Sequence, residues 1–260
     1  MRKRLASAAA CLMLFLAPLL APAARAQEAA QQPRVLVFFS LNVENDHMLY
    51  ATDALRFLAQ QGDRHGFRVE ATTDWNDLND QKLEQVQMVV WLNGAPGTDA
   101  QRAAFEKFME RGGAWLGSHV AAYTDRNFKW TWFRNFIGAG VFGVNNWPPL
   151  PAKLIVDDTT SPITKGLPPT FIAPTGEWYS WRPSPRPAPN IHVLLTMDPS
   201  NYPLGIKSMI TDKDGDVPVV WTNTKYRMIY MNMGHGDKVF SSPLQNRLIE
   251  NEVLWLLHKN

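Results

Sequence analysis

The sequence has 260 residues, of which 45% are hydrophobic and 19% are charged, and its formal net charge is +2 at neutral pH. This length is sufficient for one large domain with a full hydrophobic core. The single cysteine excludes a disulfide framework within the chain and a zinc site built from several thiolates.

Residues 1–26 have the composition of a signal peptide. Residues 1–4 (Met-Arg-Lys-Arg) are positively charged, residues 11–16 form the centre of a short apolar run, and Ala24-Arg25-Ala26 matches a small-x-small cleavage site. We therefore expect cleavage near Ala26 and an exported protein, periplasmic or extracellular. The domain that follows covers residues 27–260.

Removal of this leader changes the charge of the chain. The leader contains four of the 26 Lys and Arg residues, none of the 24 Asp and Glu residues, and the only cysteine, so residues 27–260 carry 22 basic and 24 acidic side chains. No cluster of Lys and Arg remains there that would favour nucleic acid or anionic lipid. We expect neither nucleic acid nor a membrane as a partner of the mature chain.

Apolar runs and helical patterns alternate through the first half of the mature chain. Strands are expected at 34–40, 67–71, 86–92 and 112–116, and helices at 47–61 and 98–113. The second half is less regular, with strands expected at 152–156, 191–197, 218–221 and 227–233 and a closing helix at 244–258. This order predicts a single α/β domain with a doubly wound, mainly parallel sheet flanked by helices, as in flavodoxin-like folds.

Polar clusters lie at or beside several expected strand ends, where open α/β sheets bind their ligands. They are Glu44/Asp46/His47, Ser118/His119, Glu177-Trp178-Tyr179 and Gly234-His235-Gly236-Asp237. Parallel topology would bring the first, second and fourth to one edge of the sheet, as expected for a site assembled from separate loops. We expect His119, His235 and Glu177 to be catalytic, and His47, Ser118, Asn145, Trp178, Tyr179 and Trp181 to bind substrate.

Each of these residues also has a structural interpretation. His119 could be a buried histidine bonded to the backbone, and His47 could simply open the first helix. Glu177, beside two aromatic residues, could be a carboxylate with a raised pKa or a loop acid paired with Arg182 or Arg186. Ser118 lacks the following x-Gly of a nucleophile elbow, which disfavours a serine hydrolase.

Aromatic residues give a second indication of the ligand. Indole faces suit the C–H faces of a sugar, and several tryptophans lie in polar, proline-rich segments. Trp132, Phe133 and Phe136 fit the apolar face of a helix. Trp178 and Trp181 are therefore the expected platforms for a sugar ring.

These residues together resemble the ThuA-like (trehalose-utilisation) family, whose domain is similar to class I glutamine amidotransferases. The resemblance extends from about Arg34 to His258. It is carried by motifs in the family's order: Gly117-Ser118-His119-Val120-Ala121-Ala122, similar to G-x-H-x-A; Glu177-Trp178-Tyr179, similar to D-E-x-Y; Pro218-Val219-Val220-Trp221; and Gly234-His235-Gly236. It implies that His119 occupies the elbow position where amidotransferases carry cysteine, so that glutaminase chemistry is lost.

The sequence departs from the family pattern in two places. The aromatic-basic-His run after the first strand is reduced to the histidine of Asn42-Val43-Glu44-Asn45-Asp46-His47. The F-x-x-H-P motif appears as Phe142-Gly143-Val144-Asn145-Asn146-Trp147-Pro148, without histidine. The second departure bears on activity if that histidine binds a ligand or carries a proton.

Two functions from different classes follow. The first is an enzyme that acts on a sugar or keto-sugar, in which His119 and His235 are acid–base groups and Glu177 orients one of them or takes a proton itself. The second is a non-catalytic carbohydrate-binding protein that uses the same site. Both have a small carbohydrate as partner.

No cofactor is required by these motifs, and the spacing of the histidines contains no compact metal-binding pattern. A divalent metal such as zinc, held by His47, His119, His235 and a carboxylate, is a third interpretation of the same residues.

Overall fold

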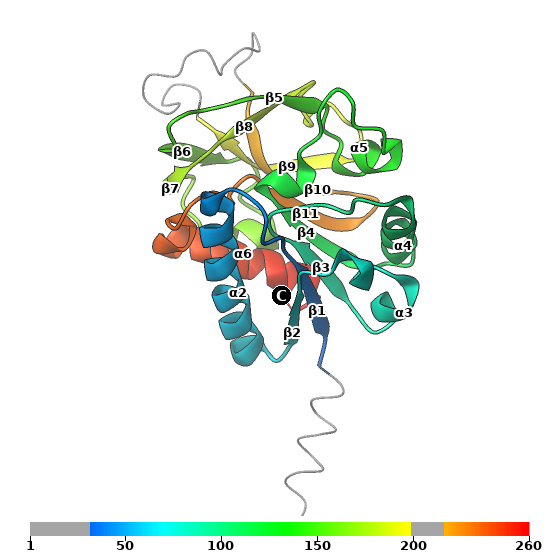
Figure 1. The fold of residues 1–260 in the computed structure, drawn as a ribbon. Coiled ribbons are helices and arrows are strands. Elements are labelled where there is room, and N and C mark those ends of the chain that lie inside the picture. Colours follow the sequence, from blue (N-terminus) through cyan, green and yellow to red (C-terminus); the bar gives the residue numbers. More distant parts are fainter. Residues whose placement is uncertain (1–31, 199–215, 260) are drawn as a thin grey trace, which may run out of the picture. The chain divides into compact units, whose positions relative to one another are not determined.

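The computed structural model of the protein describes residues 32–198 and 216–259 (Figure 1). The predicted leader lies outside the described residues. The strands are β1 (Arg34–Phe38), β2 (Arg68–Thr72), β3 (Met88–Trp91), β4 (Ala114–Ser118), β5 (Val141–Asn145), β6 (Leu150–Val156), β7 (Thr170–Gly176), β8 (Tyr179–Arg182), β9 (Ile191–Met197), β10 (Pro218–Asn223) and β11 (Arg227–Met231). The helices are α2 (Asn45–His65), α3 (Asp80–Leu83), α4 (Asp99–Glu110), α5 (Thr131–Ile137) and α6 (Pro243–Leu256). None of these described helices is both long enough and apolar enough to cross a membrane.

Nine of these strands form one sheet in the order β2-β1-β3-β4-β11-β10-β9-β6-β7, and β5 pairs with β8 in a separate two-stranded sheet. Neighbours from β2 to β11 are parallel, whereas neighbours from β11 to β7 are antiparallel. The sheet is therefore mixed, and the expectation of a mainly parallel sheet is correct only for its first part. The chain between β10 and β11, residues 224–226, is long enough for a hairpin but not for a parallel crossover.

Helices cover both faces of the sheet, as expected from the apolar strands (Figure 1). One core cluster joins α2 and α6 to the sheet, with Tyr50 and Leu248 among its members. A second cluster joins α4 and α5 to the opposite face, with Phe105 and Phe133 among its members. In β1 the side chains alternate between the two clusters, since successive residues of a strand point to opposite faces.

The local signals that begin and end the helices are partly as predicted. Thr98 caps α4 through a capping box in which its hydroxyl accepts from the backbone N–H of Gln101. Helix α2 continues past the predicted end at Gly62 to a left-handed Gly66. Gly62 lies inside the helix. A glycine is needed at this position because a Cβ there would be 2.7 Å from the carbonyl oxygen of Phe67, where the chain turns into β2.

Candidate active site at the ends of β4 and β11

Three histidines converge at the carboxyl edge of the parallel strands, as the sequence predicts. β4 and β11 pair in parallel, and His119 and His235 follow their carboxyl ends. His47 lies in the first turn of α2, which follows β1. Its ring centroid is 5.3 Å from that of His119 and 5.0 Å from that of His235. With Glu177, these three residues form what we call the His–Glu cluster.

His119 occupies a sharp turn between β4 and a short 3₁₀ helix. Its φ of 49° lies in the left-handed region, which residues with a Cβ rarely adopt. Gly234 makes room for this turn, because a Cβ there would be 2.4 Å from the Cβ of His119. Gly117, at the end of β4, makes room for the Trp115 indole, which would lie 2.0 Å from a Cβ at that position. The strained turn places the imidazole of His119 in the His–Glu cluster.

Backbone and aromatic contacts fix the orientation of His119. Its Nδ1 lies 3.0 Å from the carbonyl oxygen of Asn232, which can only accept, so Nδ1 carries a proton and donates it. The Tyr230 hydroxyl donates to the carbonyl oxygen of His119 at 3.1 Å. The Tyr179 ring stacks on the imidazole at 4.1 Å between centroids. Nε2 of His119 therefore faces Oε2 of Glu177, at 3.1 Å.

Glu177 connects β7 to β8 and places its carboxylate between two histidines. Oε1 accepts a hydrogen bond from Nδ2 of Asn145, and Oε2 lies 3.5 Å from Nδ1 of His235. The surroundings of this carboxyl favour a lowered pKa over the raised pKa that the sequence suggested. Burial acts to raise the pKa of this carboxyl, but the neighbouring histidines, His119 first, outweigh burial and lower it. Arg186, a suggested partner, pairs instead with Asp157 and Asp216.

His235 is almost fully buried and is held against the first turn of α2. Its Nε2 lies 3.1 Å from Oδ2 of Asp46, and the N–H of Gly236 donates to the carbonyl oxygen of Asp46 at 3.0 Å. Neither ring nitrogen of His235 makes a hydrogen bond of good geometry with another described residue. The same holds for Nε2 of His47. Nδ1 of His235 and Nε2 of His47 are thus available to a ligand.

The surroundings of His47 and His119 favour unprotonated imidazoles. Burial, together with His119 and His235, lowers the pKa of His47 to about 4. Burial also lowers the pKa of His119. The side chains of His47 and Glu177 are each 13% exposed, so solvent reaches the cluster. At neutral pH the imidazoles of His47 and His119 are therefore bases or metal ligands rather than charged donors.

Of the residues predicted to bind substrate, His47 belongs to the cluster, and Asn145 and Tyr179 contact it, but three others do not fit that role. Ser118 is buried; it accepts a hydrogen bond from the Tyr50 hydroxyl and donates to the carbonyl oxygen of Trp91. Trp178 and Trp181 are 1% and 2% exposed and belong to the two core clusters. They present no indole face to solvent, which corrects the expectation that they are sugar platforms.

Trp147 is the exposed indole that the sequence interpretation did not select. It is 65% exposed, and its ring centroid lies 6.5 Å from that of His235 in an edge-on arrangement. The signal in the sequence was its place in Asn146-Trp147-Pro148-Pro149, a polar and proline-rich segment that cannot extend a buried strand.

Two buried asparagines that were not predicted hold the site together. Asn146 accepts from the backbone N–H of Trp178 and donates to the carbonyl oxygen of Gly176, so it brackets Glu177. Asn232 accepts from His119 through its carbonyl oxygen and from the N–H of Tyr179 through its side chain. The only signal for Asn232 was an amide in the otherwise apolar run Met231-Asn232-Met233.

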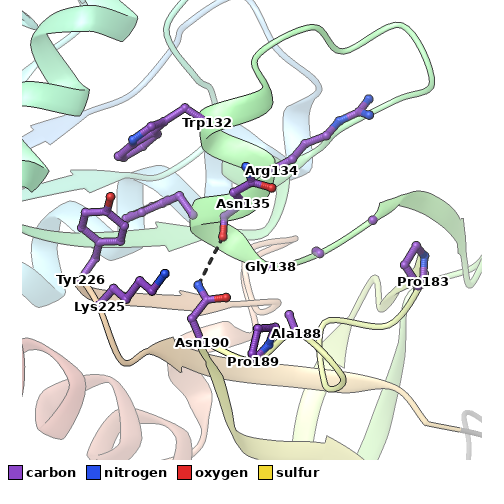
Figure 2. Close-up of a pocket in the computed structure, with 13 residues that line it drawn as sticks. Trp132, Arg134, Asn135, Gly138, Pro183, Ala188, Pro189, Asn190, Lys225 and Tyr226 are labelled. Carbon is purple, nitrogen blue, oxygen red and sulfur yellow. Dashed lines mark hydrogen bonds between the residues drawn. The ribbon is translucent and has the colours of Figure 1, made fainter.

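A pocket of about 540 Å³ lies elsewhere, beside α5 and the β10–β11 turn (Figure 2). Trp132, Asn135, Asn190, Lys225 and Tyr226 are among its lining residues, and Nδ2 of Asn190 donates to the carbonyl oxygen of Asn135 at 3.4 Å. None of the cluster residues lines this pocket. Lys225 and Tyr226 precede β11, whereas His235 follows it, so the pocket and the cluster are at opposite ends of this strand.

The sequence model of the trehalose-utilisation family (ThuA) matches residues 34–256. The chain belongs to this family. A ThuA-like protein from Bacteroides uniformis is 44% identical; the match covers 88% of this chain and 94% of that protein, with a TM-score of 0.83. A ThuA-like protein from Parabacteroides merdae is 18% identical, covers 88% and 91% of the two chains, and has a TM-score of 0.62. The sequence matches no curated protein.

The fold of this ThuA-like protein is also that of glutamine amidotransferases. The glutaminase domain of Trypanosoma brucei CTPS, solved with bound acivicin, is 11% identical, with 88% of this chain and 95% of that domain covered and a TM-score of 0.54. At this identity the likeness concerns the fold alone. Residues 27–260 contain no cysteine, and His119 occupies the turn after β4.

Proposed function

We propose that this ThuA-like protein is an exported enzyme that acts on a sugar or keto-sugar at the His–Glu cluster. The observation that carries the proposal is the convergence of three imidazoles and one carboxylate beside the exposed indole of Trp147. The description of the family as trehalose utilisation supports a sugar, in a disaccharide-catabolism setting, as the substrate class. The signal-peptide pattern of residues 1–26 supports a periplasmic or extracellular location.

The charge states of the cluster suit a reaction that begins with removal of a proton. A neutral imidazole and an ionised carboxylate are both bases, and a carbon next to the carbonyl of a keto-sugar is acidic enough to be deprotonated by a positioned base. His119, His235 and Glu177 are the acid–base residues in this proposal. The contact of His119 with Glu177 provides a route by which a proton can pass between them.

Binding of the sugar is assigned to the residues around the cluster. Trp147 offers an apolar face for the C–H groups of a ring, and Asn145 can exchange its contact with Glu177 for a sugar hydroxyl. A two-carboxylate glycosidase is a poorer match, because Glu177 is the single carboxylate of the cluster.

Turnover measured on the purified mature chain tests this proposal. The substrates are a panel of disaccharides and the corresponding keto-disaccharides, with product analysis by mass spectrometry. We expect turnover of at least one keto-sugar and its loss in His119→Ala. The matched control is His192→Ala, which removes an exposed histidine paired with Asp158, outside the cluster. Activity that survives His119→Ala would refute the assignment.

A non-catalytic carbohydrate-binding protein is the second candidate. It is favoured by Asn145 and Asn146, which stand where the family pattern has a histidine. This candidate predicts saturable binding of a sugar with no product formed from any member of the panel. Calorimetry on the same protein samples distinguishes the two, since only the enzyme consumes its ligand.

A further inference from the structure

We propose that His47, His119, Glu177 and His235 together hold one divalent transition-metal ion. The inference rests on the proposed function and deepens it: it names a cofactor for the same site, and with the ion bound these side chains would serve as its ligands instead of as acid–base groups. One potential ligand atom from each residue lies within 4.8 Å of all the others. Residues from four separate segments supply them, so that the fold rather than a compact motif builds the site.

The first support is a set of lone pairs without donors. Nε2 of His47 and Nδ1 of His235 are buried and have no hydrogen-bond partner among the described residues. Because Nδ1 of His119 donates to Asn232, its Nε2 is an acceptor when the ring is neutral, and it faces the carboxylate of Glu177. Acceptors directed into one small buried volume need a cation or protons between them.

The distances between these atoms are compatible with one ion bound among them. Zinc bonds to nitrogen and oxygen are about 2.0–2.2 Å long, which separates two tetrahedral ligands by about 3.4 Å. Oε2 of Glu177 lies 3.1 Å from Nε2 of His119 and 3.5 Å from Nδ1 of His235. These two separations fit neighbouring ligands, and all four ligand atoms lie within 4.8 Å of one another.

The second support is the set of groups behind these ligands. Metal-binding histidines usually direct their other ring nitrogen at a carboxylate or a backbone carbonyl, which fixes the ring and its tautomer. His119 has this arrangement with the carbonyl oxygen of Asn232, and His235 has it with the carboxylate of Asp46. Asn145 holds the second oxygen of Glu177. Three of the four ligands are thus oriented from outside the cluster.

The ligand types indicate which ions fit. Three imidazoles and one carboxylate, without a thiolate, suit zinc and neighbouring first-row divalent ions, whereas calcium and magnesium prefer oxygen ligands. When bound, such an ion polarises a carbonyl or hydroxyl oxygen. The partial exposure of His47 and Glu177 leaves a side from which a sugar oxygen can approach. The substrate class of the proposed function is unchanged.

Binding of Zn²⁺ alone tests the inference. The mature chain is stripped with a chelator, dialysed and titrated with Zn²⁺ by calorimetry, and the melting temperature is followed in parallel, since an ion that binds only the folded state stabilises it. We expect one Zn²⁺ per chain and a higher melting temperature. Co²⁺ in place of Zn²⁺ should give visible absorption bands that Zn²⁺ competes away. Absence of saturable binding would overturn the inference.

Variants separate this site from other ways of binding zinc. His235→Ala and Glu177→Gln should abolish stoichiometric binding, and Asp46→Asn, which keeps all four ligands, should weaken it by about 10- to 100-fold. His192→Ala should leave it unchanged. Glu44→Gln should also leave it unchanged, which excludes the more exposed grouping of Glu44, Asp46 and His235. Equal losses in the His192 or Glu44 variants would overturn the assignment of ligands.

Circular dichroism of each variant shows whether binding is lost because a ligand is missing or because the protein is unfolded. If the variants at buried residues do not fold, Asp46→Asn still tests the site, because the Asp46 side chain is partly exposed.

The metal site and the proposed reaction can fail independently. If chelator-treated protein binds no Zn²⁺ but still turns over a keto-sugar, the metal site is overturned and the proposed enzymatic function stands. Stoichiometric Zn²⁺ binding with no turnover of any sugar upholds the metal site and refutes the proposed reaction.

Discussion

Nε2 of His119 lies 3.1 Å from Oε2 of Glu177, although 58 residues separate the two in the sequence. His119 follows β4, in the parallel part of the sheet, and Glu177 lies between β7 of the antiparallel part and β8 of the small sheet. The contact therefore joins the two differently built parts of the domain. A catalytic or metal-binding role for the cluster requires both parts to be in place.

Replacement of Glu177 by glutamine tests this contact with little change in size. The amide removes the negative charge next to His119 and His235, so it can neither take a proton nor bind a cation as a carboxylate does. We expect the kcat for the sugar substrate to fall by about 10²- to 10⁴-fold, the usual contribution of a positioned acid or base. Glu84→Gln, at an exposed position on the surface, is the control. A loss below threefold would contradict the role of Glu177.

Gly234→Ala tests the packing that positions His119. The added Cβ would be 2.4 Å from the Cβ of His119, a separation that forces the histidine or the loop to move. We expect loss of most sugar turnover and of Zn²⁺ binding while the far-ultraviolet spectrum of the fold is retained. Gly97→Ala is the matched control, because nothing lies within 4 Å of a Cβ at that position. Normal activity in Gly234→Ala would show that the turn tolerates displacement of His119.

The convergence of His47, His119 and His235 could be predicted from the sequence because each follows a strand of the parallel part. Parallel strands share one carboxyl edge, so the ends of β1, β4 and β11 lie together whatever the details of packing. Thr98 was predictable as a helix cap because its capping box is local. Signals of this kind depend on a few neighbouring residues or on strand direction alone.

The antiparallel part could not be predicted as well because its patterns are weaker. β5 has no fully buried residue, and proline lies next to or within β6, β7 and β8. The burial of Trp178 and Trp181 depends on long-range packing, which leaves no periodic trace in a short segment. Trp147 also lies in a polar segment with proline nearby, yet it is exposed. Only the tertiary structure distinguishes an indole in the core from one beside the cluster.

Trp147→Ala tests the role of the exposed indole in sugar binding. Loss of one aromatic face should weaken binding by about 1 kcal/mol, a roughly fivefold higher KM, with kcat changed much less. The melting temperature should stay within about 2 °C of the parent, because the side chain is mostly exposed. Trp147→Phe, which keeps an aromatic face, should recover most of the affinity. An unchanged KM in Trp147→Ala would place the sugar elsewhere.

Asn145 is expected to position Glu177 rather than to react. Its Nδ2 donates to Oε1 of Glu177, and removal of this bond in Asn145→Ala should lower kcat by about 10-fold, near 1.4 kcal/mol. Asn145→Asp replaces the donor by a second carboxylate facing the first, so it should lower kcat further. Equal activity of the alanine and aspartate variants would contradict this electrostatic ordering.

Glu252 of α6 carries a pH dependence that is independent of the cluster. Its side chain is fully buried, and neither carboxylate oxygen has a hydrogen-bond partner among the described residues. Burial raises the pKa of this carboxyl well above its usual value, and its titratable neighbour is Tyr50 of α2. The folded protein therefore keeps Glu252 protonated at a pH where the unfolded chain releases the proton.

The sign of the effect follows from this difference. A raised pKa in the folded state gives stability that is complete below the unfolded pKa and is lost as the pH rises, at about 1.4 kcal/mol per pH unit until the folded pKa is reached. Glu252→Gln removes the titration and keeps the shape. Its free energy of unfolding relative to the parent should therefore rise as the pH increases above the unfolded pKa, in urea titrations over a series of pH values. Exposed Glu84→Gln should show no such trend. A constant difference for Glu252→Gln would mean that Glu252 is ionised in the folded protein, with a cation or water bound at its buried oxygens.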